Sequence, residues 1–446
     1  MKFDLIVIGS GMSGMTIANK CAAKGLNTAV TDSRPYGGTC ALRGCDPKKI
    51  LIGAAEIIDR ANKMSNIGIS GKVEINWNEL MAYKNDFVSN MPPRVEKGYQ
   101  KNDVTMFHGA ASFESPNSIK IGDDILESDK IVISTGAKAR TLNIPGNDLC
   151  IDSSDFLNLD SLPNHVTFIG GGYISFEFAH LVARAGSKAT ILHKGERPLE
   201  NFDEDMVDHL VKATEGLNID LKLKSEVVAI EKTNNHLIVT TKSENSTQTI
   251  QTDIVVNAAG RVPELDGLNL EKANVEYGKK GIIVNEFLQS KSNSSVYAAG
   301  DCAATQGLNL TPVAVMEGHA VASNIIRGNS KKPDYTEMPS SLFTLPPLSA
   351  VGFTEKELQD KEISYHVNSG SAKDWYNAKR INESTYAYKV LLNDEGYILG
   401  AHLIGPHSEE TINLFALAIK NKIKANSLKS FVYSYPSMAS DVGSMV

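Results

Sequence analysis

The chain has 446 residues, 42% of them hydrophobic and 22% charged, which predicts a globular protein of about two to four domains. Its net charge of −7 argues against nucleic acid or an anionic membrane as the main partner, and no apolar run approaches the roughly 20 residues of a membrane span. The N-terminal apolar run is too short for a signal peptide and the five cysteines are thinly spread, so we expect a cytoplasmic protein in which close cysteines are redox-active or metal-binding.

The first pattern, over residues 3–32, is an apolar strand, a glycine turn, an amphipathic helix and a second apolar strand. Gly9, Gly11 and Gly14 fit G-x-G-x-x-G, in which the glycines allow a tight turn, a close approach to a pyrophosphate and close packing of helix on strand. Asp32 ends the second strand about 20 residues on, where an acid can accept hydrogen bonds from ribose hydroxyls. This pattern predicts a dinucleotide site, and the alternative is a purely structural strand–turn–helix.

The next stretch is "GGTCALRGCDPKKIL", residues 37–51, with four residues between Cys40 and Cys45. Zinc fits poorly, because no second Cys/His pair of metal spacing follows. Pro47 suits the first turn of a helix, whose dipole, together with the nearby lysines, stabilises a thiolate. The sequence therefore predicts a redox-active cysteine pair at the start of a helix.

The strand–turn–helix–strand plan returns over residues 165–194, so we expect a second dinucleotide site. Its turn has Gly170 and Gly172, with Ser175 in the third slot, where a small residue can still pack. Its second strand ends in cations where an NAD site has an acid, namely His193, Lys194 and Arg197. Cations suit a 2′-phosphate, which favours NADPH over NADH. The alternative is that these are solvated loop charges, and two glutamates in the same loop weaken the NADPH assignment.

The last part of the chain follows a polar stretch over 329–340 that contains two prolines and is typical of a linker. Beyond it, the strand patterns "AYKVLLN" and "YILGAHLIG" and the helical pattern "EETINLFALAIKNK" predict a third domain of α+β type.

Further motifs appear in one order along nearly the whole chain: "ISTGAKAR", "GGGYISFE", "NAAGRVPE", "VYAAGDCA", "LTPVAVMEG" and "FTLPPLSAVGFTEKEL". By these and the motifs above, the chain resembles the class I pyridine nucleotide-disulfide oxidoreductases, the flavoprotein family of glutathione reductase, dihydrolipoamide dehydrogenase and mercuric reductase. The resemblance implies an α/β fold with two Rossmann-like domains, for FAD and NAD(P)H, and a C-terminal α+β dimerisation domain. The expected boundaries are 1–149 and 281–330 for the FAD domain, 150–280 for the NAD(P)H domain and 331–446 for the dimerisation domain, in a homodimer.

The resemblance also implies roles for single residues. The FAD site would comprise Gly9, Gly11, Gly14, Asp32, Gly38, Thr39, Lys49, Ala110, Thr135, Gly136, Gly300, Asp301 and Thr311. The NADPH site would comprise Gly170, Gly172, Tyr173, Ile174, His193, Lys194, Arg197, Gly260 and Arg261. Cys45 would be the charge-transfer thiol against the flavin, and Cys40 the interchange thiol that attacks the substrate. Lys48 would lie near flavin N5 and pair with Glu177. Electrons would run from NADPH through FAD to the disulfide of the two cysteines and then to an acceptor.

The C-terminus departs from this family. A glutathione reductase has a His-Pro followed by an acid, whereas this chain has Tyr435 before the proline, Ser440 in place of the acid and Asp441 just after it. An imidazole titrates near 6.5 and a phenol near 10, so Tyr435 cannot readily take the proton of Cys40. Mercuric reductases also carry tyrosine here, but they end in a vicinal cysteine pair that this chain lacks.

The expected acceptor site departs as well. The positions of the arginines that hold the carboxylates of glutathione are Asn19 and His319 here, and asparagine does not replace a bidentate arginine. Arg43 and Arg94 would bring positive charge to the acceptor cleft, or they are surface charges. We therefore expect a small disulfide or a thiol-reactive oxidant, and not glutathione disulfide, as acceptor. The alternatives are a non-disulfide acceptor (metal ion, quinone, oxygen or a hypohalous oxidant) and a flavin–cysteine redox sensor. No metal site and no nucleic-acid or membrane partner is expected.

Overall fold

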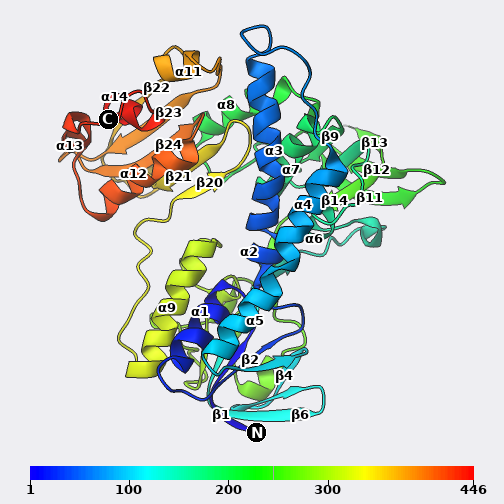
Figure 1. The fold of residues 1–446 in the computed structure, drawn as a ribbon, viewed down its shortest axis with the longest axis vertical. Coiled ribbons are helices and arrows are strands. Elements are labelled where there is room, and N and C mark those ends of the chain that lie inside the picture. The colour runs from blue at the N-terminus through cyan, green and yellow to red at the C-terminus, as the bar shows by residue number, and fades with distance from the viewer. Residues whose placement is uncertain (245) are drawn as a thin grey trace. The chain divides into compact units, whose positions relative to one another are not determined.

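The computed structural model describes residues 1–244 and 246–446, which form two compact units, each assembled from separate stretches of the chain (Figure 1). The first unit comprises Met1–Lys48, Ala82–Arg140 and Arg261–Tyr335. The second unit comprises Lys49–Met81, Thr141–Gly260 and Thr336–Val446.

Seven strands form one sheet in the first unit: β1 (Lys2–Ile8), β2 (Thr28–Asp32), β3 (Thr105–His108), β4 (Ala111–Ser115), β5 (Ser118–Ile121), β6 (Asp124–Ile133) and β18 (Val296–Ala298). Their order is β3-β2-β1-β6-β5-β4, with β18 also paired to β6. The pairs of β1, β2, β3 and β18 are parallel, whereas β4 and β5 pair antiparallel. Strand β1 buries Leu5, Ile6 and Val7 completely, as expected where a parallel sheet is covered on both faces. The apolar run that predicted a strand is thereby explained.

The first unit contains the helices α1 (Met12–Ala22), α2 (Gly38–Arg43), α5 (Met91–Lys101) and α9 (Thr311–Arg327), the start of α3 (Cys45–Lys63) and the end of α4 (Trp77–Ser89). Helices α1 and α9 lie side by side (Figure 1). A Cβ at Gly318 of α9 would lie 2.9 Å from the backbone oxygen of Ser13, so the two helices can approach this closely only with glycine there. Short elements complete the unit: β7 (Ala137–Ala139), β15 (Arg261–Pro263), η2 (Leu270–Ala273), β16 (Tyr277–Gly278), β17 (Gly281–Ile283) and β19 (Ala303–Ala304).

The second unit contains the second strand–turn–helix–strand pattern. Its elements are η1 (Asn147–Leu149), α6 (Ser153–Phe156), β8 (His165–Ile169), α7 (Tyr173–Arg184), β9 (Lys188–Leu192), α8 (Glu204–Glu215), β10 (Ile219–Lys222) and β14 (Ile254–Asn257). The strands form a parallel sheet in the order β10-β9-β8-β14. A separate antiparallel sheet consists of β11 (Glu226–Lys232), β12 (Leu237–Lys242) and β13 (Thr247–Thr252). The prediction of two βαβ units is confirmed.

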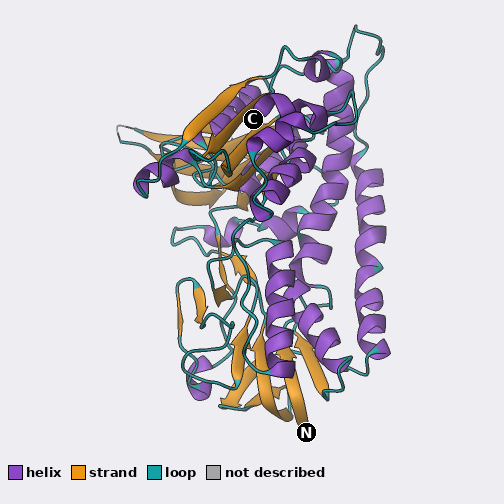
Figure 2. Cartoon of the chain, turned by 90° about the vertical axis from the view of Figure 1, so that its left-hand side faces the viewer, coloured by secondary structure: helices purple, strands orange, loops and turns teal. Residues whose placement is uncertain are grey.

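The C-terminal part of the second unit is an antiparallel sheet with helices, drawn by element type in Figure 2. Its strands are β20 (Ser340–Leu342), β21 (Leu348–Gly352), β22 (His366–Ser371), β23 (Ala387–Leu392) and β24 (Ile398–Ile404), in the order β20-β21-β24-β23-β22. Its helices are α10 (Glu355–Asp360), α11 (Tyr376–Lys379), α12 (Ser408–Lys420), α13 (Ala425–Ser430), η3 (Met438–Asp441) and α14 (Val442–Met445). This is the α+β pattern that the sequence predicts.

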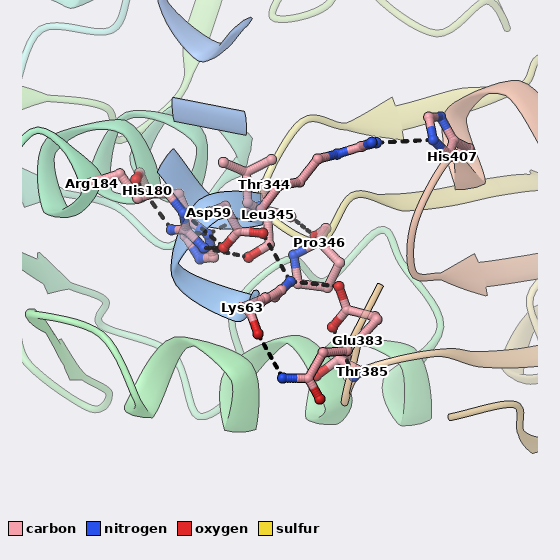
Figure 3. Close-up of polar contacts among 12 residues, drawn as sticks. Asp59, Lys63, His180, Arg184, Thr344, Leu345, Pro346, Glu383, Thr385 and His407 are labelled. Atoms are coloured by element: carbon pink, nitrogen blue, oxygen red, sulfur yellow. Dashed lines mark hydrogen bonds and ion pairs between the residues drawn. The ribbon is translucent and has the colours of Figure 1, made fainter. Parts of the chain in front are cut away.

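Buried ion pairs hold the C-terminal part of α3 within the second unit (Figure 3). The Arg184 side chain of α7, only 5% exposed, donates to Asp59 Oδ1 at 2.6 Å and to the backbone oxygen of Leu345 at 2.8 Å. Lys63 pairs with Asp59 at 2.8 Å and with the buried Glu383 at 2.5 Å. Because a buried charge that loses its partner is costly, these pairs fix this part of α3 against α7 and the C-terminal sheet.

The mixed α/β architecture is the predicted one, while the residue boundaries expected for its domains stay a prediction. Among residues 1–244 and 246–446, no helix combines the length and the apolar character needed to cross a membrane. Within the same residues, no group of three or more His, Cys, Asp or Glu side chains is placed to hold a metal ion.

Candidate active site

The glycine turn after β1 has the geometry of a phosphate-binding turn. Gly9 has a φ of +101°, and a Cβ at Gly14 would lie 2.0 Å from the oxygen of Gly9, so larger residues are excluded at both positions. Gly11 precedes α1 and, lacking a side chain, leaves the first amides of this helix available to an anion. The turn therefore fits the pyrophosphate of a dinucleotide.

Asp32 at the end of β2 braces this turn. Its Oδ2 accepts from the Ser10 amide at 2.8 Å and from Ser10 Oγ at 2.6 Å, and its Oδ1 accepts from the Arg34 amide at 3.0 Å. A carboxylate offers about four acceptor positions, so these three bonds leave room for a ribose hydroxyl. The contacts are compatible with the expected role.

Most of the residues expected around FAD lie in the first unit: Gly9, Gly11, Gly14, Asp32, Gly38, Thr39, Ala110, Thr135, Gly136, Gly300, Asp301 and Thr311. Lys49 lies at the start of the second unit, where its ammonium is 4.7 Å from the centre of the Phe343 ring. Burial raises the pKa of Asp301, and the nearby Arg261 opposes this rise. A glycine turn braced by an acid, with a half-buried carboxyl of the same unit, fits FAD.

The two cysteines lie on successive helices. Cys40 is in the short helix α2 and is half-buried, whereas Cys45 is the first residue of α3. Both are free thiols, and they hydrogen-bond to each other. Thr311 Oγ1 at the start of α9 lies 3.7 Å from Cys45 Sγ. The expectation that both cysteines sit at one helix N-terminus is therefore met by Cys45 alone.

The two thiols have opposite pKa shifts. The hydrogen bond from Cys40, assisted by Thr311 and by the charge of Lys48, lowers the pKa of Cys45 from 9.0 to about 6, against the opposing effect of burial. The same bond and burial raise the pKa of Cys40 well above its usual range. Near neutral pH, Cys45 is therefore a thiolate and Cys40 a thiol.

Sequence reasoning missed one residue of this site. Asp46 follows Cys45 in the first turn of α3, and Cys40 Sγ donates to Asp46 Oδ1 at 3.8 Å. Burial raises the pKa of the Asp46 carboxyl from 3.8, and the bond from Cys40 opposes this rise. An acid directly after the second cysteine was the available signal, but spacing alone does not show that it faces the first one.

The second glycine turn repeats the first with a serine. Ser175 Oγ donates to the backbone oxygen of Gly170 at 2.6 Å, so the small residue in the third slot closes the turn with its own hydrogen bond. Gly172 precedes α7 and leaves the first amides of the helix without a side-chain cap. This turn also fits a pyrophosphate.

Two of the three expected phosphate ligands bond to the backbone of this region instead. His193 Nδ1 accepts from the Gly171 amide at 3.2 Å, and its Nε2 lies 2.9 Å from the Arg197 carbonyl, which requires a neutral ring with hydrogen on Nε2. The Arg197 guanidinium donates to the carbonyls of Phe202 and Glu200, at 3.1 and 3.2 Å. The cation that remains exposed at the end of β9 is Lys194.

The other residues expected at the nucleotide site divide between the two units. Tyr173, Ile174, Glu177 and Gly260 belong to the second unit, whereas Arg261 begins the third stretch of the first. Tyr173 is half exposed, and Glu177 is buried, its Oε1 accepting from the Phe343 amide at 2.9 Å. The pairing of Lys48 with Glu177 stays a prediction.

Tyr435 and Asp441 do not form a pair within the chain. The Tyr435 ring is 74% exposed and stacks on Tyr376, with 6.4 Å between the ring centres. The two oxygens of Asp441 accept from Asn377 Nδ2 and from the Tyr386 hydroxyl, each at 3.0 Å. The carboxylate next to the substituted position is therefore already engaged.

Asn19 and His319 both line a cavity of about 370 Å³ formed by α1, α9 and the end of α5. It is lined by Met12, Met15, Thr16, Asn19, Lys20, Ala23, Asn102 and His319. Asn19 accepts from Asn102 at 2.8 Å and donates to the Met15 carbonyl at 3.0 Å, and Lys20 Nζ lies 3.5 Å from His319 Nδ1. The cavity thus offers thioethers and one ammonium in place of an arginine clamp.

Neither arginine proposed for the acceptor cleft lines this cavity. Arg43 is half-buried, and the charges that act on its pKa are those of Arg34, Asp32, Glu264 and Arg261. Arg34 in turn pairs with Glu264 at 2.6 Å. Arg94 is exposed on α5. Arg43 therefore belongs to a charged cluster around Asp32.

A family model for pyridine nucleotide-disulphide oxidoreductases matches residues 3–318, and one for the dimerisation domain of these proteins matches residues 338–446. The chain is 30% identical over 441 residues to a glutathione reductase of Burkholderia cepacia, with 98% of this chain and 97% of that protein covered. It is 30% identical over 447 residues to a dihydrolipoyl dehydrogenase of Bacillus subtilis (strain 168), with 98% and 96% covered. Among solved structures it is similar to the HOCl-induced flavoprotein disulfide reductase RclA from Escherichia coli and to its Cu(II) complex, each with a TM-score of 0.88, 26% identity and 99% of both chains covered.

Proposed function

We propose a function from the premise that the chain belongs to the pyridine nucleotide-disulphide oxidoreductase family, whose members are FAD-dependent oxidoreductases that use pyridine nucleotides. The proposed reaction is the transfer of two electrons from NADPH, through FAD and the Cys40–Cys45 pair, to a small disulfide or another thiol-reactive oxidant. Glutathione disulfide is not the proposed acceptor.

The cysteine pair is the observation that carries this proposal. The pKa of Cys45 is lowered and that of Cys40 is raised, so Cys45 is a stable thiolate and Cys40 a protonated thiol. The thiolate at the start of α3 suits contact with an electron-poor ring, and the thiol suits attack on a substrate once it loses its proton. Thr311 and Lys48 assist by stabilising the thiolate.

FAD, when bound, would accept hydride from the nicotinamide and pass two electrons to the disulfide of the cysteine pair. This chain would hold it with the turn from Gly9 to Gly14, with Asp32 toward the ribose and with the half-buried Asp301. The amides at the start of α1 would bind the pyrophosphate. The turn at Gly170 and Gly172 would bind NADPH in the same manner.

The proposed preference for NADPH now depends on Lys194. His193 is a neutral ring folded over the turn and Arg197 braces the loop, so neither supports binding of a 2′-phosphate in this arrangement. One exposed ammonium at the end of β9 still favours a phosphate over a hydroxyl.

The proposed acceptor is small and largely apolar, with an anionic group. This follows from the α1–α9 cavity, in which Met12 and Met15 supply apolar surface and Lys20 supplies a charge. A tripeptide disulfide with several carboxylates would lack bidentate partners there.

We also propose that the protein is a cytoplasmic homodimer. The part of the chain that matches the dimerisation-domain model exposes a set of large apolar side chains: Tyr376, Leu417, Phe431, Val432 and Tyr435. Exposed apolar surface of this kind is typical of a protein–protein interface.

A second candidate keeps the same electron path and replaces the disulfide by a hypohalous-type oxidant or a copper ion. The similarity to RclA, named for induction by HOCl and solved with Cu(II), favours it. Tyr435 also favours it, because such acceptors release no thiolate that would need a proton.

Steady-state oxidation of NADPH tests both candidates. The FAD-loaded protein would be assayed against small aliphatic disulfides, glutathione disulfide, hypochlorous acid and Cu(II), with Cys45→Ser as control for reactions that bypass the thiols. Turnover with an aliphatic disulfide that Cys45→Ser abolishes supports the first candidate. Turnover confined to the oxidant or the metal supports the second. Oxidation of NADPH that is unchanged in Cys45→Ser with every acceptor contradicts both.

A further inference from the structure

The reaction with a disulfide needs a group that accepts and donates a proton, and Tyr435 does not supply it. The attacking thiol must lose a proton and the first product must gain one, and a residue that exchanges protons near neutral pH usually serves both steps. A phenol titrates near 10, so it is protonated at neutral pH and cannot act as the base. The Tyr435 ring is exposed and stacked on Tyr376, and Asp441 is engaged by Asn377 and Tyr386.

A carboxyl group already touches the reacting sulfur. Cys40 Sγ donates to Asp46 Oδ1 at 3.8 Å, across the bend between α2 and α3. An acid in the first turn of a helix would also be explained by the helix dipole alone. The helix dipole does not require the hydrogen bond from the Cys40 thiol. The donor of this bond is the sulfur that must lose its proton, and the acceptor is the Asp46 carboxylate.

We propose that Asp46 is the catalytic acid and base of the thiol–disulfide exchange and takes the place of the missing imidazole. The inference depends on the proposed function, in which Cys40 attacks a disulfide. The motifs of the sequence give Asp46 no role.

In the two-electron reduced protein, Cys40 is a thiol and Cys45 a thiolate. As Cys40 Sγ bonds to one sulfur of the substrate, its proton passes to the Asp46 carboxylate and the substrate S–S bond breaks. The departing thiolate takes that proton from Asp46 and leaves as the first thiol. The Cys45 thiolate then attacks Cys40 Sγ, which re-forms the Cys40–Cys45 disulfide and releases the second thiolate, protonated by water. The two electrons of the cysteine pair end on the two products.

The surroundings of Asp46 support this exchange. Burial raises the pKa of its carboxyl, which makes it a better base than an exposed aspartate, and its charge in turn raises the pKa of Cys40. The ionisable groups that interact with it are the Cys40 thiol from α2 and the Cys45 thiolate on its own helix, and the Lys48 ammonium acts on that thiolate. The raised pKa of the carboxyl therefore favours acceptance of the proton, whereas the raised pKa of Cys40 opposes its release.

The test compares Asp46→Asn, Asp46→Glu and Asp123→Asn, the last being the same change at an exposed turn of the first unit. Each FAD-loaded protein is reduced anaerobically with one equivalent of NADPH and mixed with hydroxyethyl disulfide, whose leaving thiol needs a proton. A parallel mixing uses the aromatic dithiobis(nitrobenzoate), whose leaving thiolate needs none. Flavin reduction by NADPH, measured in the same instrument, reports separately on the proposed function.

Asp46→Asn should slow the reaction with hydroxyethyl disulfide by about 10²-fold or more. It should slow the reaction with the aromatic disulfide less, because there the carboxylate only accepts the proton of Cys40 and does not protonate the leaving thiolate. Asp46→Glu should recover part of the rate, and Asp123→Asn should match the unmodified protein. In the unmodified protein the rate should fall at acid pH as the Cys45 thiolate and the Asp46 carboxylate become protonated, and Asp46→Asn should lack the part of this fall that is due to the carboxylate. Equal rates for Asp46→Asn and the unmodified protein with hydroxyethyl disulfide would overturn the assignment.

A second measurement is independent of any acceptor. In a Cys45→Ser background, alkylation of Cys40 by iodoacetamide follows the formation of its thiolate. Removing the Asp46 charge with Asp46→Asn should move the midpoint of alkylation to lower pH, because the carboxylate no longer opposes the thiolate. An unchanged midpoint means that Asp46 does not act on Cys40 and overturns the assignment, even if NADPH reduces the flavin normally.

Discussion

Replacing Lys194 by alanine should remove the preference for NADPH over NADH. Of the three cations that end the second βαβ unit, His193 is held neutral by Gly171 and the Arg197 carbonyl, and Arg197 itself donates to two carbonyls. One charge-assisted hydrogen bond to the 2′-phosphate therefore remains, worth about 1.5–3 kcal/mol. At 1.36 kcal/mol per factor of ten, this is a preference of roughly 10–150-fold in kcat/KM.

The assay is the rate of flavin reduction by each nucleotide under anaerobic conditions, measured over a range of concentrations. Lys188→Ala removes an exposed lysine at the opposite end of the same strand and serves as the control. Lys194→Ala should bring the two nucleotides to nearly equal kcat/KM, whereas Lys188→Ala should leave the preference intact. If Lys194→Ala keeps the full preference, or if the unmodified protein prefers NADH, the assignment of the phosphate to Lys194 is wrong.

Three further outcomes follow from the contacts. Thr311→Val should raise the pH midpoint of Cys45 thiolate formation from about 6, by roughly 0.7 pH units for one lost hydrogen bond. The midpoint is measured from the absorbance of the thiolate. An unchanged midpoint would show that Thr311 does not stabilise this thiolate. Asp59→Ala should lower the free energy of unfolding in urea by about 3–5 kcal/mol, because the buried Arg184 then lacks its ion-pair partner. The pKa of Asp59 in the folded protein lies below 3.8, so the stability that this ion pair contributes should be lost as the pH falls through that pKa. A change in the free energy of unfolding near zero would contradict this. Tyr435→His should raise the rate of disulfide turnover by far less than the roughly 10²-fold that a positioned imidazole supplies, because the neighbouring Asp441 carboxylate is already hydrogen-bonded. A full gain in turnover would show that other groups orient the new imidazole.

The fold follows from the sequence where local patterns determine it. Apolar runs before Gly9 and Gly170 predict buried parallel strands, and the spacing of the glycines predicts the turns and the helices after them. Pro47 predicts the first turn of α3, and with it the thiolate at Cys45. In each case the signal and the structure involve neighbours in the chain.

The site departs from expectation where the direction of a side chain decides its role. The place of His193 after a strand predicts a cation, but its ring folds back over Gly171 and both ring nitrogens bond to backbone. Asp46 gave no periodic signal, and its contact with Cys40 depends on the bend between two helices. Asp441 likewise turns toward Tyr386, which spacing does not encode.

Anaerobic addition of one equivalent of NADPH to the FAD-loaded protein tests the electron path most directly. The Cys45 thiolate at the start of α3 should give a long-wavelength absorbance through its contact with the flavin, and this absorbance should fade with a midpoint near pH 6 as the thiolate takes up a proton. Cys45→Ser should reduce its flavin without this absorbance. A reduced unmodified protein that lacks the absorbance at neutral pH would contradict the assignment of Cys40 and Cys45 as the redox-active pair.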